Sequence, residues 1–337
     1  MAEAAATKQE LERQAAIAAA FRKYDGLYSD LRSKDAELLE GRPLLAHYTS
    51  IQALERILVS NELWFSSPLL MNDVEELRFG MLEGHQQVMS SSAIRQACGS
   101  DARVNKFLEA FNKYSEEFRN AHALDVFVLC MSEHTKGDSD GLLSMWRGYG
   151  GNGTGAAIVF DTARIGNQTG SPLVASKVDY LSTDARRIWL SKKVDEFADL
   201  LKQVNTSDDF LFVGAWAIFL RIKLFAMFTK HHGFSEEKEW RVVYLKERDV
   251  KNLCGPMIDY FIGPQGVELK LKLKVEPKEG LTAPDLSLGK VVHQIILGPS
   301  AATPLAMAAL LRMLDKIGKP EFKNRIVASG IPFRGRI

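Results

Sequence analysis

Two glutamates stand close together immediately before a predicted strand, in the segment EKEWR at residues 237–241. Residues i and i+2 of a strand point to the same face, so Glu237 and Glu239 are expected to lie side by side. Neighbouring carboxylates repel unless a cation lies near them, and Arg241, Lys230, His231 or a cationic ligand could supply it. Such a pair suits acid–base chemistry or the stabilisation of an oxocarbenium ion. The alternative is a solvated loop whose charges make ordinary surface pairs.

Other polar and aromatic signatures also stand beside predicted strand ends. His47 and Tyr48 end one strand and point to opposite faces, and Ser66 ends the next. A single histidine or serine of this kind could bind a ligand or form a structural hydrogen bond. The segment MWRGYG at 145–150 joins Trp146, Arg147 and Tyr149, which could stack on a ring or cover the core.

The segment MND at residues 71–73, with Glu76 after it, has two interpretations. Asn72 or Asp73 can cap the helix that follows, and acidic residues in a first turn are favoured by the positive helix end. The same polar groups could instead contribute to a site.

Metal and nucleotide fingerprints are not found in the sequence. Cys98, Cys130 and Cys254 are far apart, which suggests neither zinc nor disulfides and fits a reducing cytoplasm. The adjacent His231 and His232 cannot easily share one ion, and no H-E-x-x-H is present, so we predict no metal. The glycines at 148–155 do not match G-x-G-x-x-G followed by a helix and are expected to form a tight loop.

The bulk composition is that of a soluble globular protein. The chain has 337 residues, of which 46% are hydrophobic and 25% charged, with a net charge of +1. No global basic field exists for nucleic acid or anionic membrane. The apolar run 210–228 contains Arg221 and Lys223, and a basic residue at the centre of a spanning helix costs about 2.5–3.5 kcal/mol. We therefore expect a buried core helix, no membrane association and a cytoplasmic location.

The elements predicted from periodicity and capping do not follow a regular β-α-β order, which favours an α+β fold with a central mixed or antiparallel sheet and a helical layer. Residues 1–40 are expected to form a helical extension, and 41–337 a single domain with helical insertions at about 74–119 and 183–231. The predicted strands comprise residues 44–48, 62–66, 126–132, 156–160, 174–180, 240–245 and 291–297, and a hairpin is predicted within 260–275, with alternation at 269–275. The alternating lysines of 269–275 indicate a solvated strand face or a protected edge.

The order of these motifs resembles a widespread bacterial domain family of unknown function, with members among abortive-infection and phage-defence proteins. The resemblance extends from about Leu44 to Pro299 and rests on the series HYTS, LWFSSP, MND, CMS, MWRGYG, GAAIVFD, EKEWR and IILGP.

The entry segment LAHYTS and the later LWFSS are also distantly similar to ADP-ribosyltransferases, whose sheet is split. That resemblance implies that NAD is the substrate. It implies that Glu239 stabilises the cation left when nicotinamide departs, that Glu237 orients or deprotonates the acceptor, and that His47 binds the nicotinamide ribose. Further NAD contacts are implied for Tyr48, Ser66, Asn72, Trp146, Arg147, Tyr149 and Arg241.

The leading hypothesis is therefore an NAD-consuming ADP-ribosyltransferase or NAD glycohydrolase used in bacterial defence, with nucleic acid or protein as acceptor. One alternative is a metal-dependent nuclease using Asp73, Glu76 and Glu239. Another is a non-catalytic module that senses a ligand or phage component. The transferase hypothesis requires that His47 and Glu239 face each other across one cleft.

Overall fold

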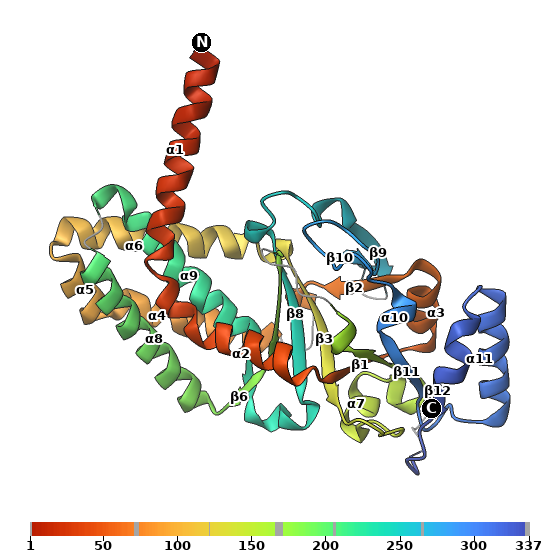
Figure 1. Cartoon of the computed structure of the whole chain (residues 1–337). Helices are drawn as coiled ribbons and strands as arrows, with labels where there is room; N and C mark the ends of the chain where they lie inside the picture. Colours follow the sequence, from red (N-terminus) through yellow and green to blue (C-terminus); the bar gives the residue numbers. More distant parts are fainter. Residues whose placement is uncertain are drawn as a thin grey trace. The chain divides into compact units, whose positions relative to one another are not determined.

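The computed structural model describes residues 2–70, 74–120, 122–165, 171–204, 207–263 and 266–333. The chain forms two compact units, each built from three separate segments. Unit 1 comprises 1–34, 72–123 and 179–232, and unit 2 comprises 35–71, 124–178 and 233–337. Both units are shown in Figure 1. The helical segments expected at the N-terminus and as insertions contribute most of unit 1.

Unit 1 is a helical assembly around α9 (Leu211–Phe228), which packs against α4 and α6, while α8 packs against α5 (Figure 1). Small residues let two of these helices approach closely, because a Cβ at Gly84 of α4 would lie 2.4 Å from the Ile222 side chain of α9. The other elements are α1 (Ala2–Arg22), α4 (Val74–Ser90), α5 (Ser92–Cys98), α6 (Asp101–Asn120), α8 (Thr183–Val204) and the parallel strands β6 (Asp179–Leu181) and β7 (Thr229–His231).

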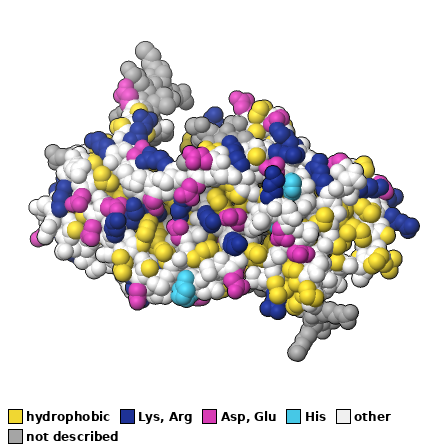
Figure 2. Space-filling view, turned by 60° about the horizontal axis from the view of Figure 1, so that its bottom comes forward, with side chains coloured by type: hydrophobic (Ala, Val, Ile, Leu, Met, Phe, Trp, Pro, Cys, Tyr) yellow, Lys and Arg dark blue, Asp and Glu magenta, His cyan; other side chains and the backbone are white. Residues whose placement is uncertain are grey.

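The helix α9 is buried on nearly all sides, as the sequence predicts. It lies within the one described stretch that is long and apolar enough to cross a membrane, and 83% of that window is buried. This burial is that of a core helix and is consistent with a soluble protein. On the face that Figure 2 shows, acidic and basic side chains are interspersed.

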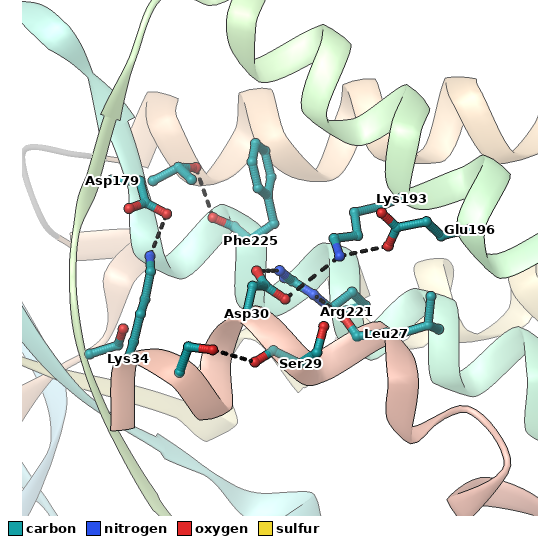
Figure 3. Close-up of polar contacts among 12 residues, drawn as sticks. Leu27, Ser29, Asp30, Lys34, Asp179, Lys193, Glu196, Arg221 and Phe225 are labelled. Carbon is teal, nitrogen blue, oxygen red and sulfur yellow. Dashed lines mark hydrogen bonds and ion pairs between the residues drawn. The ribbon is translucent and has the colours of Figure 1, made fainter. Parts of the chain in front are cut away.

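The two cations of α9 are accommodated by neighbouring groups. Arg221 is 2% exposed, donates from Nε to the Leu27 carbonyl at 3.0 Å, and forms an ion pair with Asp30 of α2 (Ser29–Gly41). The Trp189 ring stacks on its guanidinium, 4.3 Å from the ring centroid. Lys193 joins the cluster through Glu196 at 2.7 Å and Asp30 at 3.7 Å, as Figure 3 shows. The Lys223 ammonium lies over the Phe118 ring.

Unit 2 is built on a mostly antiparallel sheet in the order β12-β11-β4-β1-β3-β2-β10-β9, in which β8 also pairs with β3, and β5 with β8. This sheet confirms the α+β class. Its strands are β1 (Leu44–Thr49), β2 (Glu62–Ser66), β3 (Val126–His134), β4 (Ala156–Asp161), β5 (Leu173–Lys177), β8 (Glu239–Leu245), β9 (Ile258–Gly263), β10 (Gly266–Lys274), β11 (Val292–Leu297) and β12 (Ile326–Ala328).

Helices cover both faces of this sheet. A large apolar cluster on one face includes residues of α3 (Ile51–Ser60) and α11 (Pro304–Lys316), and a smaller cluster on the other face includes α7 (Leu143–Gly148). Ser50 and Thr303 cap α3 and α11, because their hydroxyls accept the backbone N–H groups of Ala53 and Ala306. Serine and threonine are among the residues preferred at this position, so both caps follow from the local sequence. A short α10 (Leu288–Val291) precedes β11.

The sheet opens beside β3. The strand β8 occupies one edge of β3 from Val126 to Ser132, so β1 and β2 must share the other edge. The strand β1 pairs with β3 at residues 132–134, whereas β2 pairs with it at Val128. Between the two pairings the Cys130 carbonyl contacts Nδ1 of His47 at 3.0 Å. The strands therefore diverge at His47.

Two local predictions are corrected, and a choice between two alternatives for β10 is decided. The strand predicted at 174–180 is interrupted at Val178, with β5 in unit 2 and β6 in unit 1. The helical insertion predicted to extend to about residue 231 ends at Phe228, and Lys230 lies in β7. The lysine-rich strand β10 is not an edge strand, because it lies between β2 and β9. Its lysines occupy one face and not an edge.

Candidate functional site

The left-handed backbone at Lys238 determines which polar residues enter β8. Lys238 has φ of 45°, a conformation that costs an L-residue roughly 1–2 kcal/mol. Its carbonyl accepts the Glu133 amide at 2.9 Å, which ties the turn to β3. The strand therefore starts at Glu239, and Glu237 stays in the preceding 3-10 turn. The prediction that Glu237 and Glu239 share a strand face is wrong.

The two residues that do share a face at the start of β8 are Glu239 and Arg241. Arg241 donates from Nε to Oε1 of Glu239 at 2.8 Å and from Nη2 to Oε2 at 3.0 Å. Each side chain is only 5% exposed. Arg241 is thus the cation that the sequence required beside this carboxylate. A forked, charge-assisted contact of this kind is among the strongest in proteins, and it holds the carboxylate in one orientation.

The second carboxylate, Glu237, is positioned by groups from two other elements. Tyr149, which ends α7, donates its hydroxyl to Oε1 of Glu237 at 3.2 Å. Ser132 of β3 donates its hydroxyl to the Glu237 carbonyl at 2.6 Å. The structure therefore brings together two predicted signatures, MWRGYG and EKEWR, through Tyr149 and Glu237.

His47 does not share the face of Glu239. The register aligns Ala46 with Ser132 and Ser132 with Glu239, so these three side chains lie on one face. His47 is adjacent to Ala46 and is paired with Ile158 of the large apolar cluster, so it belongs to the opposite face. The expectation that His47 and Glu239 face each other is wrong. Ala46 is the residue of β1 whose side chain lies on the face of Glu239, and His47, one position further along the strand, points to the other face.

The environment of His47 is that of a structural residue. Its pKa is lowered because burial disfavours the charged ring, although the contact with the Cys130 carbonyl opposes that shift. A neutral ring contacting a carbonyl must donate from Nδ1. His47 therefore hydrogen-bonds to the Cys130 carbonyl, at the place where β1 and β2 diverge along β3.

Tyr48 is on the face of Glu239, but its hydroxyl is engaged. It accepts the Leu142 amide at 2.8 Å, and its ring meets Trp146 edge-on with centroids 4.8 Å apart. Burial raises the pKa of Tyr48 to about 12, with an opposing effect of the Leu142 contact. Trp146 is fully buried and donates to the Asp140 carbonyl at 2.8 Å. Both side chains therefore pack in the core.

The remaining predicted residues are placed as follows. Arg147 is exposed, with its guanidinium 5.2 Å from the centroid of the Phe333 ring. Ser66 accepts a hydrogen bond from Lys270 at 2.9 Å on the β2–β10 pairing. Asn72 and Asp73 lie outside the described residues. Glu76 forms an ion pair with Arg186 inside unit 1.

Two residues that we did not predict as site residues are paired with Glu239 and Arg241 on the neighbouring strands. Ser132 is aligned with Glu239, and Ser176 of β5 with Arg241, and both serines are buried. Ser132 stands in the CMS segment, so a motif signal existed for it. Ser176 has no such signal, because only the pairing of β5 with β8 brings it here. Among the described residues, no group of three His, Cys, Asp or Glu side chains could hold a metal ion.

Comparison with known proteins places this site within one matched segment. No curated protein and no solved structure matches the chain. The match that is found covers α7 through most of β8, and so contains Tyr149, Glu237, Glu239 and Arg241. Residues 145–242 match the model of a family described as "Protein of unknown function (DUF2971)".

Proposed function

We propose that this protein cleaves the N-glycosidic bond of NAD and transfers ADP-ribose to water or to a nucleic-acid or protein acceptor. The observation that carries the proposal is the Glu239 carboxylate, buried at the start of β8 and fixed by the forked contact with Arg241. A carboxylate preset in a water-poor environment stabilises a cation that forms beside it far better than water does.

In this mechanism the bond between ribose C1′ and the nicotinamide nitrogen breaks, and its electron pair leaves with the ring, which becomes neutral. Glu239 stabilises the positive charge that develops at the ribose. The oxygen of water or of an acceptor hydroxyl then bonds to C1′ and loses its proton to Glu237. Tyr149 orients Glu237 through the 3.2 Å hydrogen bond.

The transferase hypothesis with His47 and Glu239 in one cleft fails, because the two side chains lie on opposite faces of the sheet. The function proposed here is a revised one that rests on Glu239 and Glu237 and assigns no chemical step to His47. This differs from the role that the resemblance to ADP-ribosyltransferases implies. The motif resemblance supports a cytoplasmic role in bacterial defence against phage, and the matched segment contains both signatures that meet at Tyr149 and Glu237.

The test is nicotinamide release from NAD by the purified full chain. We expect the Glu239→Gln variant to lower this rate by a factor of about 10² to 10³, because it removes a charge that the transition state requires while keeping the side-chain shape. The matched control is Glu133→Gln, which changes a carboxylate on the opposite face that contacts Lys177 and Trp240. It should change the rate less than about threefold.

The products separate the two outcomes of the chemistry. Free ADP-ribose indicates hydrolysis, and a labelled macromolecule indicates transfer. Equal turnover by Glu239→Gln and the unaltered chain would refute the assignment, provided that thermal unfolding shows both to be folded. Thermal stabilisation by NAD without turnover would instead favour a sensing module, and a nuclease activity abolished by a chelator would favour the metal-dependent alternative.

A further inference from the structure

The last residues that the structure describes, 329–333, form neither helix nor strand. Ser329 is 6% exposed, and it donates its amide to the Leu297 carbonyl and its hydroxyl to the Asp140 carbonyl, each at 2.9 Å. The Gly330 amide donates to Oδ1 of Asp140 at 2.6 Å. A segment without secondary structure stays in place only where contacts of this kind tie it down. We call residues 329–333 the strap.

Asp140 joins the strap to α7. Its carbonyl accepts a second hydrogen bond, from Nε1 of the buried Trp146 of α7 at 2.8 Å. Its amide donates to Oδ1 of Asp138 at 2.7 Å, and the Asp138 carbonyl accepts the side-chain amide of Gln294 in β11 at 2.8 Å. The loop that carries Asp140 is therefore fixed to the sheet, and it links the strap with α7.

The second half of the strap contacts α7 directly. Ile331 packs against the smaller apolar cluster, to which Met145 and Trp146 of α7 belong. The Arg147 guanidinium lies over the Phe333 ring, 5.2 Å from its centroid, and a cation is attracted to an aromatic face. The strap thus contacts α7 both at its buried side chains and at the exposed Arg147.

Phe333 also contacts the glycine-rich loop that follows Tyr149. Its carbonyl accepts the Ser300 hydroxyl at 3.1 Å. A Cβ at Gly153 would lie 3.0 Å from the Phe333 ring, so the ring packs closely on the loop backbone. The strap therefore contacts the chain on both sides of Tyr149.

The helix α7 cannot hold its own position, because it is only six residues long. Isolated helices shorter than about 12–15 residues are marginal in water. Its N-cap residue, Leu142, makes no side-chain capping bond. Tyr149 follows α7 directly, is 37% exposed, and donates its hydroxyl to Oε1 of Glu237 at 3.2 Å. The position of that hydroxyl therefore depends on the elements packed around α7, and the strap is one of them.

We propose that the strap holds α7 and the glycine-rich loop in the positions from which Tyr149 reaches Glu237, so that displacing the strap lowers the activity of the site. The part that concerns activity rests on the proposed function. The strap residues are positioning residues, because the contacts described above act on Glu237 only through α7 and Tyr149.

Hydrogen exchange measures the structural part of the proposal without any substrate. The amides of Trp146 and Tyr149 donate to the Leu142 and Met145 carbonyls and report on the opening of α7. We expect Ile331→Asp, which places a charge against the apolar cluster, to speed their exchange at least about tenfold, because α7 then opens more readily. The amides of α3 should not change.

A matched control and a milder variant accompany this measurement. Leu305→Asp makes the same kind of change on α11, where Leu305 is 81% exposed, and it should leave the exchange of α7 unaltered. Ser329→Ala removes only the hydroxyl that Asp140 accepts, and it should speed the exchange of α7 by a smaller factor. This second variant decides the question if Ile331→Asp does not fold.

Nicotinamide release measures the link between the strap and Glu237. We expect Ile331→Asp and Tyr149→Phe each to lower the rate about tenfold, because Glu237 keeps its carboxylate but loses its orientation. The double variant should be no more than about twofold slower than the single variants, since losses that act through one shared contact do not add. General destabilisation by Ile331→Asp would instead lower the rate by the same factor with or without the Tyr149 hydroxyl.

The two measurements separate this proposal from the proposed function. Unchanged exchange of α7 in both strap variants, or equal acceleration by Leu305→Asp, overturns the proposal. Faster exchange with unaltered nicotinamide release, or additive losses in the double variant, overturns the link between the strap and Glu237. If the unaltered chain releases no nicotinamide, the proposed function fails, and the exchange of α7 still decides whether the strap holds this helix.

Discussion

A single backbone angle at Lys238 separates the roles of two carboxylates. The left-handed turn leaves Glu237 in a partly exposed segment beside the Tyr149 hydroxyl, and starts the strand at the buried Glu239. Non-glycine residues in this conformation persist where the surrounding structure fixes them. Here the contact of the Lys238 carbonyl with the Glu133 amide does so. The two glutamates thus occupy different environments, and the proposed mechanism uses this difference by making Glu237 the general base and Glu239 the group that stabilises the positive charge.

For single residues, the sequence predicts on which face of its own strand a side chain lies. It does not predict which residues of the neighbouring strands are paired with it. The i, i+2 rule fails for Glu237 and Glu239, because the strand starts only at Glu239, whereas alternation within β1 correctly places Tyr48 on the face opposite His47. Alternation does not show whether His47 and Glu239 lie on the same face of the sheet. That depends on which residues of β3 are paired with β1 and with β8. An error of one position moves a side chain to the other face.

His47 should make folding stability depend on pH. Its pKa is lowered by burial, against the contact with the Cys130 carbonyl, so the unfolded chain binds a proton more readily than the folded chain. Stability is therefore complete above the unfolded pKa of about 6.5 and falls as the pH drops below it. His47→Asn keeps an amide donor near the position of Nδ1 and removes the titration, so its stability should decline less steeply.

Urea unfolding of both chains between about pH 5 and 7.5 measures this difference. The comparison between the two chains is needed because the pKa of His134 is also lowered by burial, against its contacts with Asp138. Identical slopes for the two chains would contradict the assignment of His47 as a buried neutral donor.

The glycine-rich segment 148–155 packs the end of α7 against the ends of two strands. A Cβ at Gly155 would lie 2.2 Å from the Thr49 carbonyl oxygen and 2.8 Å from that of Gly150. A Cβ at Gly298, after β11, would lie 2.5 Å from the Gly153 carbonyl oxygen. These are backbone contacts, so neither neighbour can move aside cheaply. The glycines form the tight loop that the sequence predicts. Their lack of a side chain lets the loop backbone pack directly against the backbone at the ends of β1 and β11.

We expect Gly155→Ala to lower the free energy of unfolding by at least about 2 kcal/mol, because the added methyl group overlaps two carbonyls. Gly148→Ala is the matched control. It lies in α7 with open space around its Cβ, and alanine favours a helix by up to about 1 kcal/mol over glycine. Chemical denaturation of the two variants should therefore give changes of opposite sign. Equal losses would argue against the packing explanation.

Most element boundaries could be predicted because their signals are local. The Ser50 cap, the apolar run 126–132 and the largely apolar α9 each follow from spacing or composition. The break between β5 and β6 has no such signal, because it arises where the chain passes from unit 2 to unit 1. The place of β10 inside the sheet likewise depends on β9 and β2, which pair with it from opposite sides.

Residues distant in the sequence stabilise unit 1. Asp30, near the N-terminus, pairs with Arg221 of the buried helix α9, and its side chain is 34% exposed (Figure 3). Removing one partner of a buried ion pair leaves the other charge without compensation. The cluster of Asp30, Arg221 and Lys193 thus fixes the start of α2 on this unit.

Asp30→Asn should therefore destabilise the protein by about 2 to 3 kcal/mol, less than for a fully buried pair because Asp30 is partly solvated. Asp25→Asn is the matched control from the same segment. Asp25 and Arg32 are 3.5 Å apart and more than half exposed, so their pair should contribute at most about 0.5 kcal/mol. Thermal and urea unfolding of both variants checks the difference. A loss no larger than that of the control would contradict the structural role of the cluster.

The interleaving of the two units has a consequence for synthesis in the cell. Arg221 follows Asp30 by 191 positions, so the partner of Asp30 leaves the ribosome long after α2 does. At about 5–20 residues per second, the delay is roughly 10 to 40 s. Unit 1 also cannot close before residue 232 has emerged. Until then, the helices of unit 1 that have already emerged lack the partners that bury their apolar side chains in the folded unit.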